Sequence, residues 1–551
     1  MTKNYKEQNF EDHIEEHLLN SGYNKKLSGD YDKELCLIPQ EAIQFIKSSQ
    51  PEEFQKLQKQ YGTDTEQKLL QRLAKQIDQN GALHVLRKGF KDRGEDLKLT
   101  YFKPASGMNP QHHHLYSLNR FAIIRQLYYS TRSTLSIDMT LFLNGIPIIT
   151  MELKNSLTGQ FVEDAIKQYQ NRNPKEPLFL FKRCPVHFAV GNEKVFMTTH
   201  LKGDKTRFLP FNLDTENPIN PNGHKTAYLW QDILHPQTLM DLIDNYLHVQ
   251  KKEEKDFDKK TNQIKVSEYE EFVFPRFHQL DVVRKLLHAV KQEGVGQTYL
   301  VQHSAGSGKS NSIAWLSHQL TSLFMKESDN ERLFDSIIVV TDRKILDRQL
   351  QNTITQFEQT KGVVHPIDKN SQQLKETLQQ GKSIIITTLQ KFPVISESIA
   401  HIPGKNFAVI VDEAHSSQSG ESSKHMKQVL ATNLEKAETE DHVEFDVEDE
   451  ALKEIRIRGK QPNISYFAFT ATPKSKTLEL FGRKDENGKQ RAFHNYTMRQ
   501  AIEEGFILDI LQNYTTFKRY FVSAQISTSF QEPGNLSEYS NILKIKNKGV
   551  F

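Results

Sequence analysis

Hydrophobic residues along this chain change their rhythm near Phe274. Beyond that point, short apolar runs with the length of buried strands alternate with amphipathic helical stretches. The runs are Tyr299–Gln302, Ser336–Val340, Ser383–Thr387, Phe407–Val411 and Tyr466–Thr470. Strands that alternate with helices indicate βαβ units, so we predict an α/β domain whose parallel sheet is covered by helices.

Residues 1–245 mix helical and strand patterns. Phe10, Ile14 and Leu18 share one helical face and Gly22 provides a stop, which predicts an amphipathic helix. Further helices are predicted between Glu41 and Leu83 and over Phe161–Gln170, and strands over Leu135–Leu143, Ile148–Lys154 and Val186–Val190. This half is therefore expected to be a separate α/β domain.

The predicted domain boundaries follow from these patterns. We expect a first domain over 1–245, a charged linker over 246–270, a second domain over 271–495 and the incomplete start of a further lobe over 496–551. The run His248–Lys260 is rich in charge, which predicts a linker or a solvated helix end.

Composition narrows the class of protein. Formal net charge is only +3, so a nucleic-acid partner has to be argued from particular sites. Cys36 and Cys184 are the two cysteines and are far apart, which predicts neither a disulfide framework nor a cysteine metal site. Because no apolar run approaches a membrane span and the N-terminus lacks a signal core, we predict a cytoplasmic protein.

The first candidate site is a small-residue loop between an apolar strand and a helical pattern. It consists of Ser304, Ala305, Gly306, Ser307, Gly308, Lys309 and Ser310. Backbone N–H groups of such a loop can surround a nucleotide's phosphates, with Lys309 on the outer phosphates and Ser310 on Mg²⁺. His303 stands where the usual pattern has its first glycine. The alternative is a glycine-rich turn before an ordinary helix.

A second apolar strand delivers Asp412 and Glu413 to the carboxyl edge of the predicted sheet, where open α/β sheets bind ligands. Asp412 suits the Mg²⁺ shell, and Glu413 could orient and deprotonate the water that attacks the γ-phosphate. Alone, such a pair would be the start of a solvated loop. The phosphate loop upstream favours the functional interpretation.

A predicted hairpin carries a second candidate site. Glu152 and Lys154 are two residues apart in a strand, so they share a face. A two-residue turn would put Asp138 and Glu152 on opposite faces, whereas a three-residue connection over Asn144–Ile146 makes them direct partners. Pro147 also favours the margin of a loop, so we predict the three-residue connection.

Two carboxylates at this spacing suit Mg²⁺. The ion would make a bound water a better nucleophile and neutralise charge on a scissile phosphate. Asp138 and Glu152 would be the metal ligands, and Lys154 could stabilise or position the nucleophile. The alternative is a half-exposed hairpin in which Glu152 and Lys154 form a surface pair.

Several of these segments resemble motifs I, II and III of superfamily 2 helicases and translocases, whose lobes are RecA-like. The segments are Ser304–Ser310, Asp412–His415 and Thr470–Thr472. Gln279 stands where such proteins place a glutamine that reads adenine, and Thr341–Arg343 and Thr387–Gln390 resemble their single-strand-backbone motifs. The resemblance implies ATP and Mg²⁺ as cofactors, with His415, Thr470 and Thr472 coupling hydrolysis to movement.

The hairpin resembles the core of PD-(D/E)xK nucleases, with Asp138, Glu152 and Lys154 in the metal and catalytic roles. Glu11 matches the extra acidic residue of the RecB-like branch, and Glu15 competes for that place. Gln168 falls where this branch has a Gln-x-x-x-Tyr motif. Here Arg172 stands four residues later, and the tyrosine is at position 169.

A nuclease hairpin ahead of such a motor resembles the restriction subunit of type I restriction-modification enzymes, along nearly the whole chain. The resemblance implies an ATP-dependent endonuclease that joins methyltransferase and specificity subunits and pumps double-stranded DNA past itself. It would cut away from the recognition site, and it would not itself select that sequence.

Superfamily 2 motors hydrolyse ATP between two lobes, and residues 496–551 resemble only the entry to the second. We therefore expect this chain, as a fragment or a natural truncation, to bind ATP with weak or absent hydrolysis and translocation. Two other functions stay open: a stand-alone helicase–nuclease of DNA repair, and a truncated module that docks on the methyltransferase complex without cutting. Replacing Asp138 or Lys154 by alanine distinguishes an enzyme from a docking module.

Overall fold

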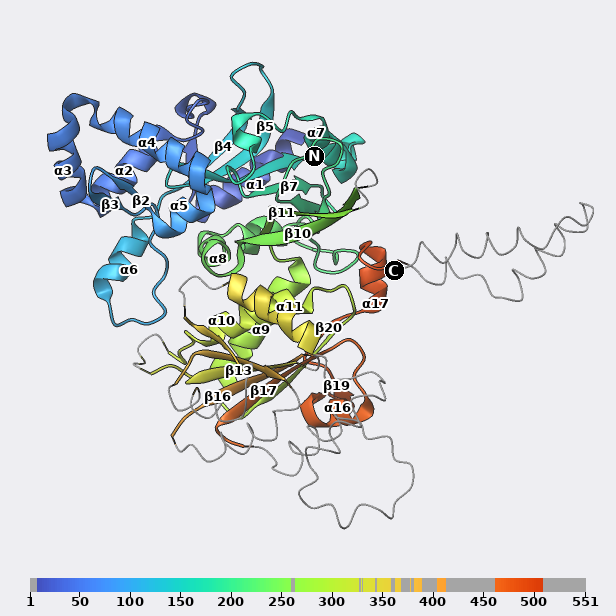
Figure 1. The fold of residues 1–551 in the computed structure, drawn as a ribbon. Coiled ribbons are helices and arrows are strands. Elements are labelled where there is room, and N and C mark those ends of the chain that lie inside the picture. The colour runs from blue at the N-terminus through green and yellow to red at the C-terminus, as the bar shows by residue number, and fades with distance from the viewer. Residues whose placement is uncertain are drawn as a thin grey trace, which may run out of the picture. The chain divides into compact units, whose positions relative to one another are not determined.

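The computed structural model describes residues 7–258, 263–326, 329, 331–341, 344–357, 362–367, 377, 381–388, 404–412 and 461–508 (Figure 1). The described residues as far as Glu504 form one compact unit, which contains two seven-stranded sheets with helices packed against them. The predicted α/β class is therefore confirmed for both halves of the chain.

The N-terminal sheet has the strand order β1-β4-β5-β6-β7-β8-β9. Its strands are β1 (Asn24–Lys26), β4 (Phe121–Tyr128), β5 (Ser136–Leu143), β6 (Ile146–Leu153), β7 (Val186–Val190), β8 (Val195–Thr198) and β9 (Leu209–Pro210). β6 lies between antiparallel β5 and parallel β7, and all of its residues are buried. The three predicted strands are confirmed as β5, β6 and β7, whereas β4 was not predicted.

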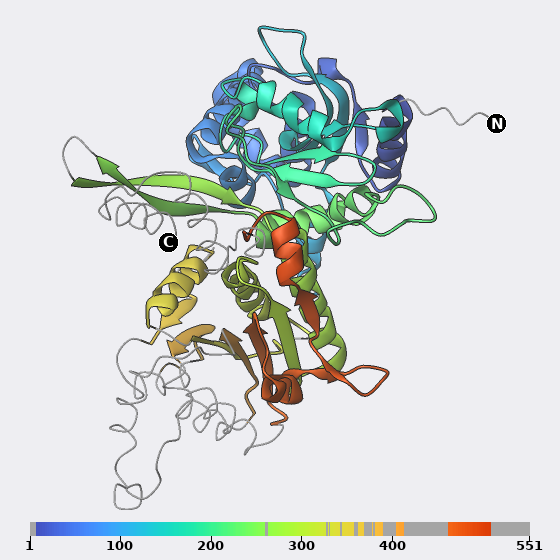
Figure 2. The same cartoon turned by 90° about the vertical axis from the view of Figure 1, so that its right-hand side faces the viewer.

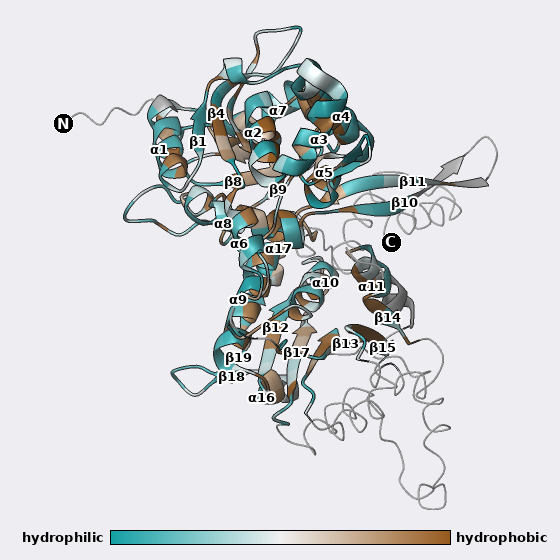
Figure 3. Ribbon diagram, turned by 90° about the vertical axis from the view of Figure 1, so that its left-hand side faces the viewer, coloured by the Kyte–Doolittle hydropathy of each residue, from teal (hydrophilic) through white to brown (hydrophobic). Residues whose placement is uncertain are grey.

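The helices of this half follow the predicted apolar periodicity. Phe10, Ile14 and Leu18 of α1 (Glu7–Asn20) are buried, and Gly22 adopts a φ of +115° just beyond its end. The others are α2 (Pro39–Ser49), α3 (Pro51–Tyr61), α4 (Thr65–Asn80), α5 (Ala82–Lys88), α6 (Pro110–Ser117) and α7 (Val162–Asn171). Hydrophobic and hydrophilic residues both colour α1 and α4, as amphipathic helices require (Figure 3). A small hairpin, β2 (Phe90–Asp92) with β3 (Glu95–Leu97), follows α5.

The turn between β5 and β6 corrects the predicted connection. Asn144 and Gly145 have φ values of +49° and +80° and form a two-residue turn, so the predicted loop over Asn144–Ile146 is wrong. The buried Asn144 amide donates to the carbonyl of Leu99 at 2.8 Å, and a Cβ on Gly145 would lie 2.6 Å from the carbonyl oxygen of Ile38. These neighbours favour the tight turn.

A β-bulge in β6 restores the register that the longer loop was expected to give. Phe142 pairs with Pro147, which therefore lies inside the strand rather than at a loop margin. The next pair is Leu141 with Ile149, so β6 contains one extra residue here. The extra residue shifts each later pair by one position and brings the carboxylates predicted to be partners into register.

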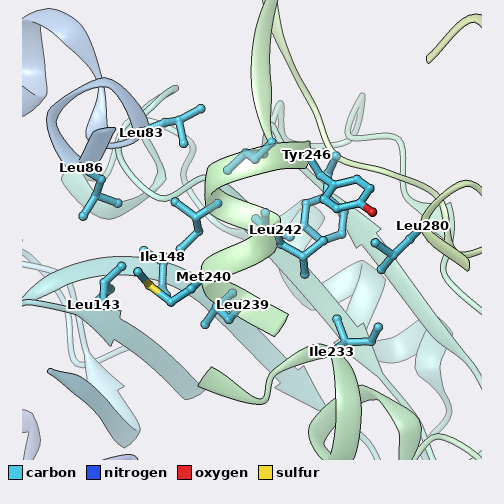
Figure 4. Packing of buried hydrophobic residues seen from close by; sticks show 14 of the residues in the cluster. Leu83, Leu86, Leu143, Ile148, Ile233, Leu239, Met240, Leu242, Tyr246 and Leu280 are labelled. Carbon is cyan, nitrogen blue, oxygen red and sulfur yellow. The ribbon is translucent and has the colours of Figure 1, made fainter. Parts of the chain in front are cut away.

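The segment that leaves the N-terminal sheet is helical and apolar. It contains the π-helical turns Leu229–Ile233 and Leu242–Tyr246, with α8 (Pro236–Asp241) between them. Figure 4 shows Met240 of this segment close to Ile148 of β6. The indole N–H of Trp315 donates to the carbonyl of Tyr246 at 2.8 Å, so this segment also contacts a helix of the second half.

The charged run expected to be a linker or a helix end forms a β-hairpin instead. β10 (His248–Asp258) pairs antiparallel with β11 (Gln263–Val273), and Figure 2 shows the pair as a long ribbon. Lys251 stands opposite Glu270, and Lys252 forms an ion pair with Glu271. Such cross-strand pairs compensate for the scarcity of apolar residues, which had favoured the prediction of a linker.

The C-terminal sheet has the strand order β14-β15-β13-β16-β17-β12-β20. Its strands, all paired in parallel, are β12 (Thr298–His303), β13 (Ser336–Thr341), β14 (Val364–Pro366), β15 (Ile384–Thr388), β16 (Phe407–Asp412), β17 (Ile464–Thr470) and β20 (His494–Tyr496). The five predicted strands are confirmed. β20 contains residues on both sides of the domain boundary predicted at 495/496, and it is hydrogen-bonded to β12.

The helices that the described residues of this half form are α9 (Phe277–Glu293), α10 (Lys309–Leu320), α11 (Lys344–Gln356), α16 (Ser475–Phe481) and α17 (Met498–Glu503). A short hairpin, β18 (Arg483–Lys484) with β19 (Gln490–Arg491), follows α16. Throughout the part of the chain that the structure describes, no helix has the length and apolar character needed to cross a bilayer.

Candidate active sites

Two central strands of the N-terminal sheet bring the predicted nuclease residues together. Asp138 lies in β5, and its Oδ2 accepts a hydrogen bond from the backbone N–H of Leu153 in β6 at 2.8 Å. Lys154 follows β6 and donates its amide to the carbonyl of Val190 at 2.9 Å. Glu152 is fully buried and Lys154 is 9% exposed, so the alternative of a half-exposed surface pair is wrong.

Glu152 is paired with Arg172, a side chain that the sequence did not identify as its partner. Arg172 donates from Nη2 to Glu152 and, at 2.7 Å, to the carbonyl of Ser136, while Nη1 donates to the hydroxyl of Tyr129 at 2.9 Å. Burial, followed by the charge of Asp138, raises the pKa of Glu152, and Arg172 opposes this shift. The site therefore contains a buried ion pair.

A polar chain joins the first helix to Asp138. Gln126 donates from Nε2 to Glu11 and to Asp138, in both cases at 3.2 Å. Arg125 donates to Glu11 at 2.8 Å and to Glu15 at 3.1 Å, so both competing acids contact it. Of the two, Glu11 is the one that Gln126 connects to Asp138, which favours Glu11 as the additional acidic residue.

The backbone at Gln126 is strained. Gln126 has a φ of +48° inside β4, between the pairs that Arg125 and Leu127 make with β5. A left-handed conformation costs a residue with a Cβ about 1–2 kcal/mol. Such strain persists where the surroundings fix the residue, and it is common at functional sites.

The strain at Gln126 predicts that a glycine variant at this position is more stable than an alanine variant. Gln126→Gly and Gln126→Ala remove the same side-chain hydrogen bonds, so Gln126→Gly should be the more stable variant by about 1 kcal/mol. Free energies of unfolding in urea measure the difference. At the exposed Lys167 of α7 the order should reverse, with Ala more stable by about 1 kcal/mol, because glycine disfavours a helix. An Ala variant at 126 as stable as the Gly variant would show that the strain is absent.

The Gln-x-x-x-Tyr spacing is filled differently in this chain. Gln168 is half-buried on α7, and its side chain has no hydrogen-bond partner among the described residues. The hydroxyl of the buried Tyr169 lies 2.9 Å from Oγ1 of Thr150 in β6. Arg172 takes the fourth position and reaches the buried carboxylate. The sequence shows that Arg172 replaces the tyrosine of the motif. Only the structure shows that this arginine pairs with Glu152.

The paired carboxylates fit a divalent cation. Glu152 Oε2 is buried and has no hydrogen-bond partner within the described ranges, so one oxygen of the pair still lacks a partner. Asp138 and Glu152 offer the oxygen ligands that Mg²⁺ prefers, and waters and substrate phosphate commonly complete its shell. No cage of three or more His, Cys, Asp or Glu side chains forms in the described parts of the chain, so any metal here would depend on such additional ligands.

In the C-terminal sheet, the small-residue loop lies between β12 and α10, as predicted. Gly306 and Gly308 have φ values of +73° and +75°, and α10 begins at Lys309. Ala305 and Gly306 are exposed, whereas Ser307 Oγ is buried and lacks a hydrogen-bond partner among the described residues. Exposed backbone at a helix N-terminus is suited to binding phosphate, so the loop fits a nucleotide.

Residues at the start of α9 hold the backbone of this loop. Gln279 donates from Nε2 to the carbonyls of Ser307 and Gly308 at 2.9 and 3.1 Å. Arg276 donates from Nη2 to the carbonyl of Gly306 at 2.9 Å. Gln279 therefore contacts the loop itself, and its predicted contact with adenine stays a prediction.

Other predicted motor residues lie at the ends of neighbouring strands. Asp412 ends β16 and Thr470 ends β17, and both strands run parallel to β12, so these buried residues and the loop share one edge of the sheet. Thr472 is exposed and Ser310 is half-buried. Several predicted positions lie outside the described residues, namely Glu413, His415, Asp342, Arg343, Leu389 and Gln390.

Known proteins match both halves. The family described as "Type I restriction enzyme R protein N terminus" matches residues 4–206, and the family described as "SWI2/SNF2 ATPase" matches residues 278–439. The type I restriction enzyme HindI endonuclease subunit of Haemophilus influenzae is 27% identical over 416 residues, which cover 71% of this chain and 34% of that protein. Over residues 4–206 this chain is therefore similar to the N-terminal part of type I restriction R proteins.

The type I restriction enzyme SauMSSORF170P endonuclease subunit of Staphylococcus aureus is 22% identical, over 74% of this chain and 38% of that protein. The chain thus spans about a third of the length of these two curated relatives. Among solved structures, the SWI2/SNF2 ATPase core of Sulfolobus solfataricus in complex with dsDNA has a TM-score of 0.22 and 14% identity, covering 36% of this chain and 33% of that one. A TM-score of 0.22 is too low to indicate a shared fold.

Most predicted site residues lie inside the ranges that match the two families. The R-protein range contains Glu11, Asp138, Glu152, Lys154 and Gln168; the ATPase range contains Gln279, Ser304–Ser310, Asp412 and Glu413. Thr470 and Thr472 lie beyond it. The two matched ranges therefore contain most of the segments from which both candidate sites are built.

Proposed function

We propose that this chain acts as the restriction subunit of a type I restriction-modification complex. It would use ATP to translocate double-stranded DNA and Mg²⁺ to cut that DNA away from the recognition site, in a cytoplasmic assembly with methyltransferase and specificity subunits. The observation that supports this most strongly is the buried Asp138–Glu152 pair in the same chain as a phosphate loop. One oxygen of this pair has no hydrogen-bond partner in the part of the chain that the structure describes.

In the nuclease site, Asp138 and Glu152 would bind Mg²⁺, which supplies a more acidic water and neutralises charge on the scissile phosphate. Arg172 holds one oxygen of Glu152, which leaves the other oxygen for the metal. Gln126 orients Asp138, and Glu11 orients Gln126. Lys154, two residues beyond Glu152 on the same face, would stabilise the attacking water or the developing charge.

In the motor site, the backbone from Ser304 to Gly308 would surround the phosphates, with Lys309 at the outer phosphates. Ser310 and Asp412 would hold Mg²⁺, and Glu413 would activate the attacking water. Thr470 and Thr472 would couple hydrolysis to movement along DNA. Gln279 would contact adenine from its position beside the loop.

The test is cleavage of a circular plasmid by the protein that carries these residues, combined with the methyltransferase and specificity subunits of its own system. We expect linear product only when ATP and Mg²⁺ are both present. Asp138→Ala and Lys154→Ala should each abolish cleavage while the complex still assembles. Glu163→Ala, at an exposed position of α7, is the matched control and should cut like the unmodified complex.

The same experiment separates the alternatives. If Asp138→Ala and Lys154→Ala complexes cut normally, the proposed nuclease role is wrong and the chain is better described as an assembly module. If cleavage needs neither partner subunit, a stand-alone helicase–nuclease explains the chain better.

A further inference from the structure

A buried histidine stands directly before the phosphate loop of this chain, and its side chain takes part in a hydrogen-bonded relay. His303 ends β12 and is fully buried. Its Nε2 lies 2.8 Å from Nδ1 of His494, the first residue of β20, and Nε2 of His494 lies 2.9 Å from Oδ2 of Asp281 on α9. The glycine usual at position 303 could not make this contact, because it has no side chain.

The carboxylate of Asp281 fixes one end of this relay, because Nε2 of His494 donates to it. Nδ1 of His494 and Nε2 of His303 share one proton, so a single hydrogen bond joins the two rings. Burial, followed by the neighbouring His494, lowers the pKa of His303 well below its usual value, which favours the neutral form of this ring. The three side chains therefore form one continuous hydrogen-bonded chain from His303 through His494 to Asp281.

Strand β20 also contacts the backbone of the loop. Ser304 donates its amide to the carbonyl of Tyr496 at 3.0 Å. The ring of Tyr496 stacks on His278 with centroids 3.7 Å apart, and Nε2 of His278 lies 3.0 Å from the carbonyl oxygen of Ser307. The loop and β20 are thus connected at the first residue of the loop and again near its middle.

β20 is a three-residue strand at the edge of the sheet, so backbone pairing alone holds it weakly. In the chain it leads directly to α17 (Figure 1). Side-chain contacts with His303 and His278 therefore have a large share in keeping it against β12.

We propose that Asp281, His494 and His303 form a positioning relay that couples nucleotide binding at the phosphate loop to the seating of β20 on β12. The inference rests on the proposed nucleotide role of the loop. A bound phosphate that orders the backbone at Ser304 also orders His303 and the hydrogen bond to Tyr496. By thermodynamic linkage, a firmly seated β20 should in turn favour nucleotide binding.

Binding of the non-hydrolysable analogue adenylyl imidodiphosphate with Mg²⁺, measured by calorimetry, tests the first half of this inference. His303→Gly and His494→Phe should each weaken binding by about tenfold, a typical coupling between linked sites. The double variant should lose no more than either single variant, because both break the same relay. His288→Gln, at an exposed position of α9, should bind like the unmodified chain.

Hydrogen exchange at the amides of residues 494–496 tests the second half and reports on coupling rather than on stability. The analogue should slow exchange there in the unmodified chain, and this slowing should disappear in His303→Gly. His303→Gln keeps an N–H donor and should restore part of it, and it also serves as the test variant if His303→Gly does not fold. Normal affinity together with nucleotide-dependent protection in His303→Gly would refute the relay. An unmodified chain that binds no analogue would instead refute the nucleotide role on which the relay depends.

Discussion

Arg172→Ala is expected to destabilise the protein by about 3–5 kcal/mol, the usual cost of removing one partner from a buried ion pair. The variant removes the cation that stabilises the ionised form of Glu152, whose side chain is fully buried and is already repelled by Asp138. Tyr129 and the carbonyl of Ser136 also lose their donors. The free energy of unfolding in urea, followed by circular dichroism, measures the effect.

Two further variants make this prediction specific to the ion pair. Lys167→Ala removes an exposed positive charge from the adjoining helix and should change stability by less than about 0.5 kcal/mol. In a Glu152→Gln background, Arg172→Ala should cost clearly less than in the unmodified chain, because no buried charge is left unpaired. If Arg172→Ala lowers the free energy of unfolding no more than Lys167→Ala does, the pairing of Arg172 with Glu152 does not stabilise the fold.

Gly308→Ala is expected to weaken binding of Mg²⁺–ATP by about 100-fold, since steric strain and two lost hydrogen bonds together amount to about 2–5 kcal/mol. Gly308 has a φ of +75°, and an added Cβ would lie 2.3 Å from Nε2 of Gln279. That amide donates to the carbonyls of Ser307 and Gly308, so its displacement would remove these two hydrogen bonds between α9 and the loop.

Gly294 provides a matched control for this experiment. Its φ of +76° is almost the same, but a Cβ there would meet nothing within 4 Å. Gly294→Ala should therefore cost about 1 kcal/mol of stability and leave nucleotide affinity unchanged. Equal nucleotide affinities for Gly308→Ala and Gly294→Ala, measured by equilibrium titration, would contradict the role assigned to the contact with Gln279.

Local patterns predicted the main elements of this fold. The five apolar runs of the second half became parallel strands, and Phe10, Ile14 and Leu18 are the buried face of α1. Such features depend on residues close together in the sequence, whose periodicity directly reflects burial. The candidate carboxylates and the phosphate loop were also recognisable, because their spacing is set within one hairpin or one turn.

Contacts between distant segments could not be predicted in this way. Arg172 reaches Glu152 from the end of α7, and His303 of β12 contacts His494 of the neighbouring strand β20. Both residues were visible as departures from familiar motifs, but a sequence position alone does not show which partner a side chain will face. The charged run that became β10 was missed for a related reason, because its ladder depends on pairing with β11.

Because β6 contains an extra residue, the number of residues between Asp138 and Glu152 does not determine the length of the turn that joins their strands. A hairpin with a longer tip and an unbroken ladder would align Asp138 and Glu152 equally well from the same number of intervening residues. Related chains could therefore move one residue from the tip into the strand, or back, without disturbing the alignment of the two carboxylates. Evolution is free to reshape the end of this hairpin while the geometry between the two acids stays constant.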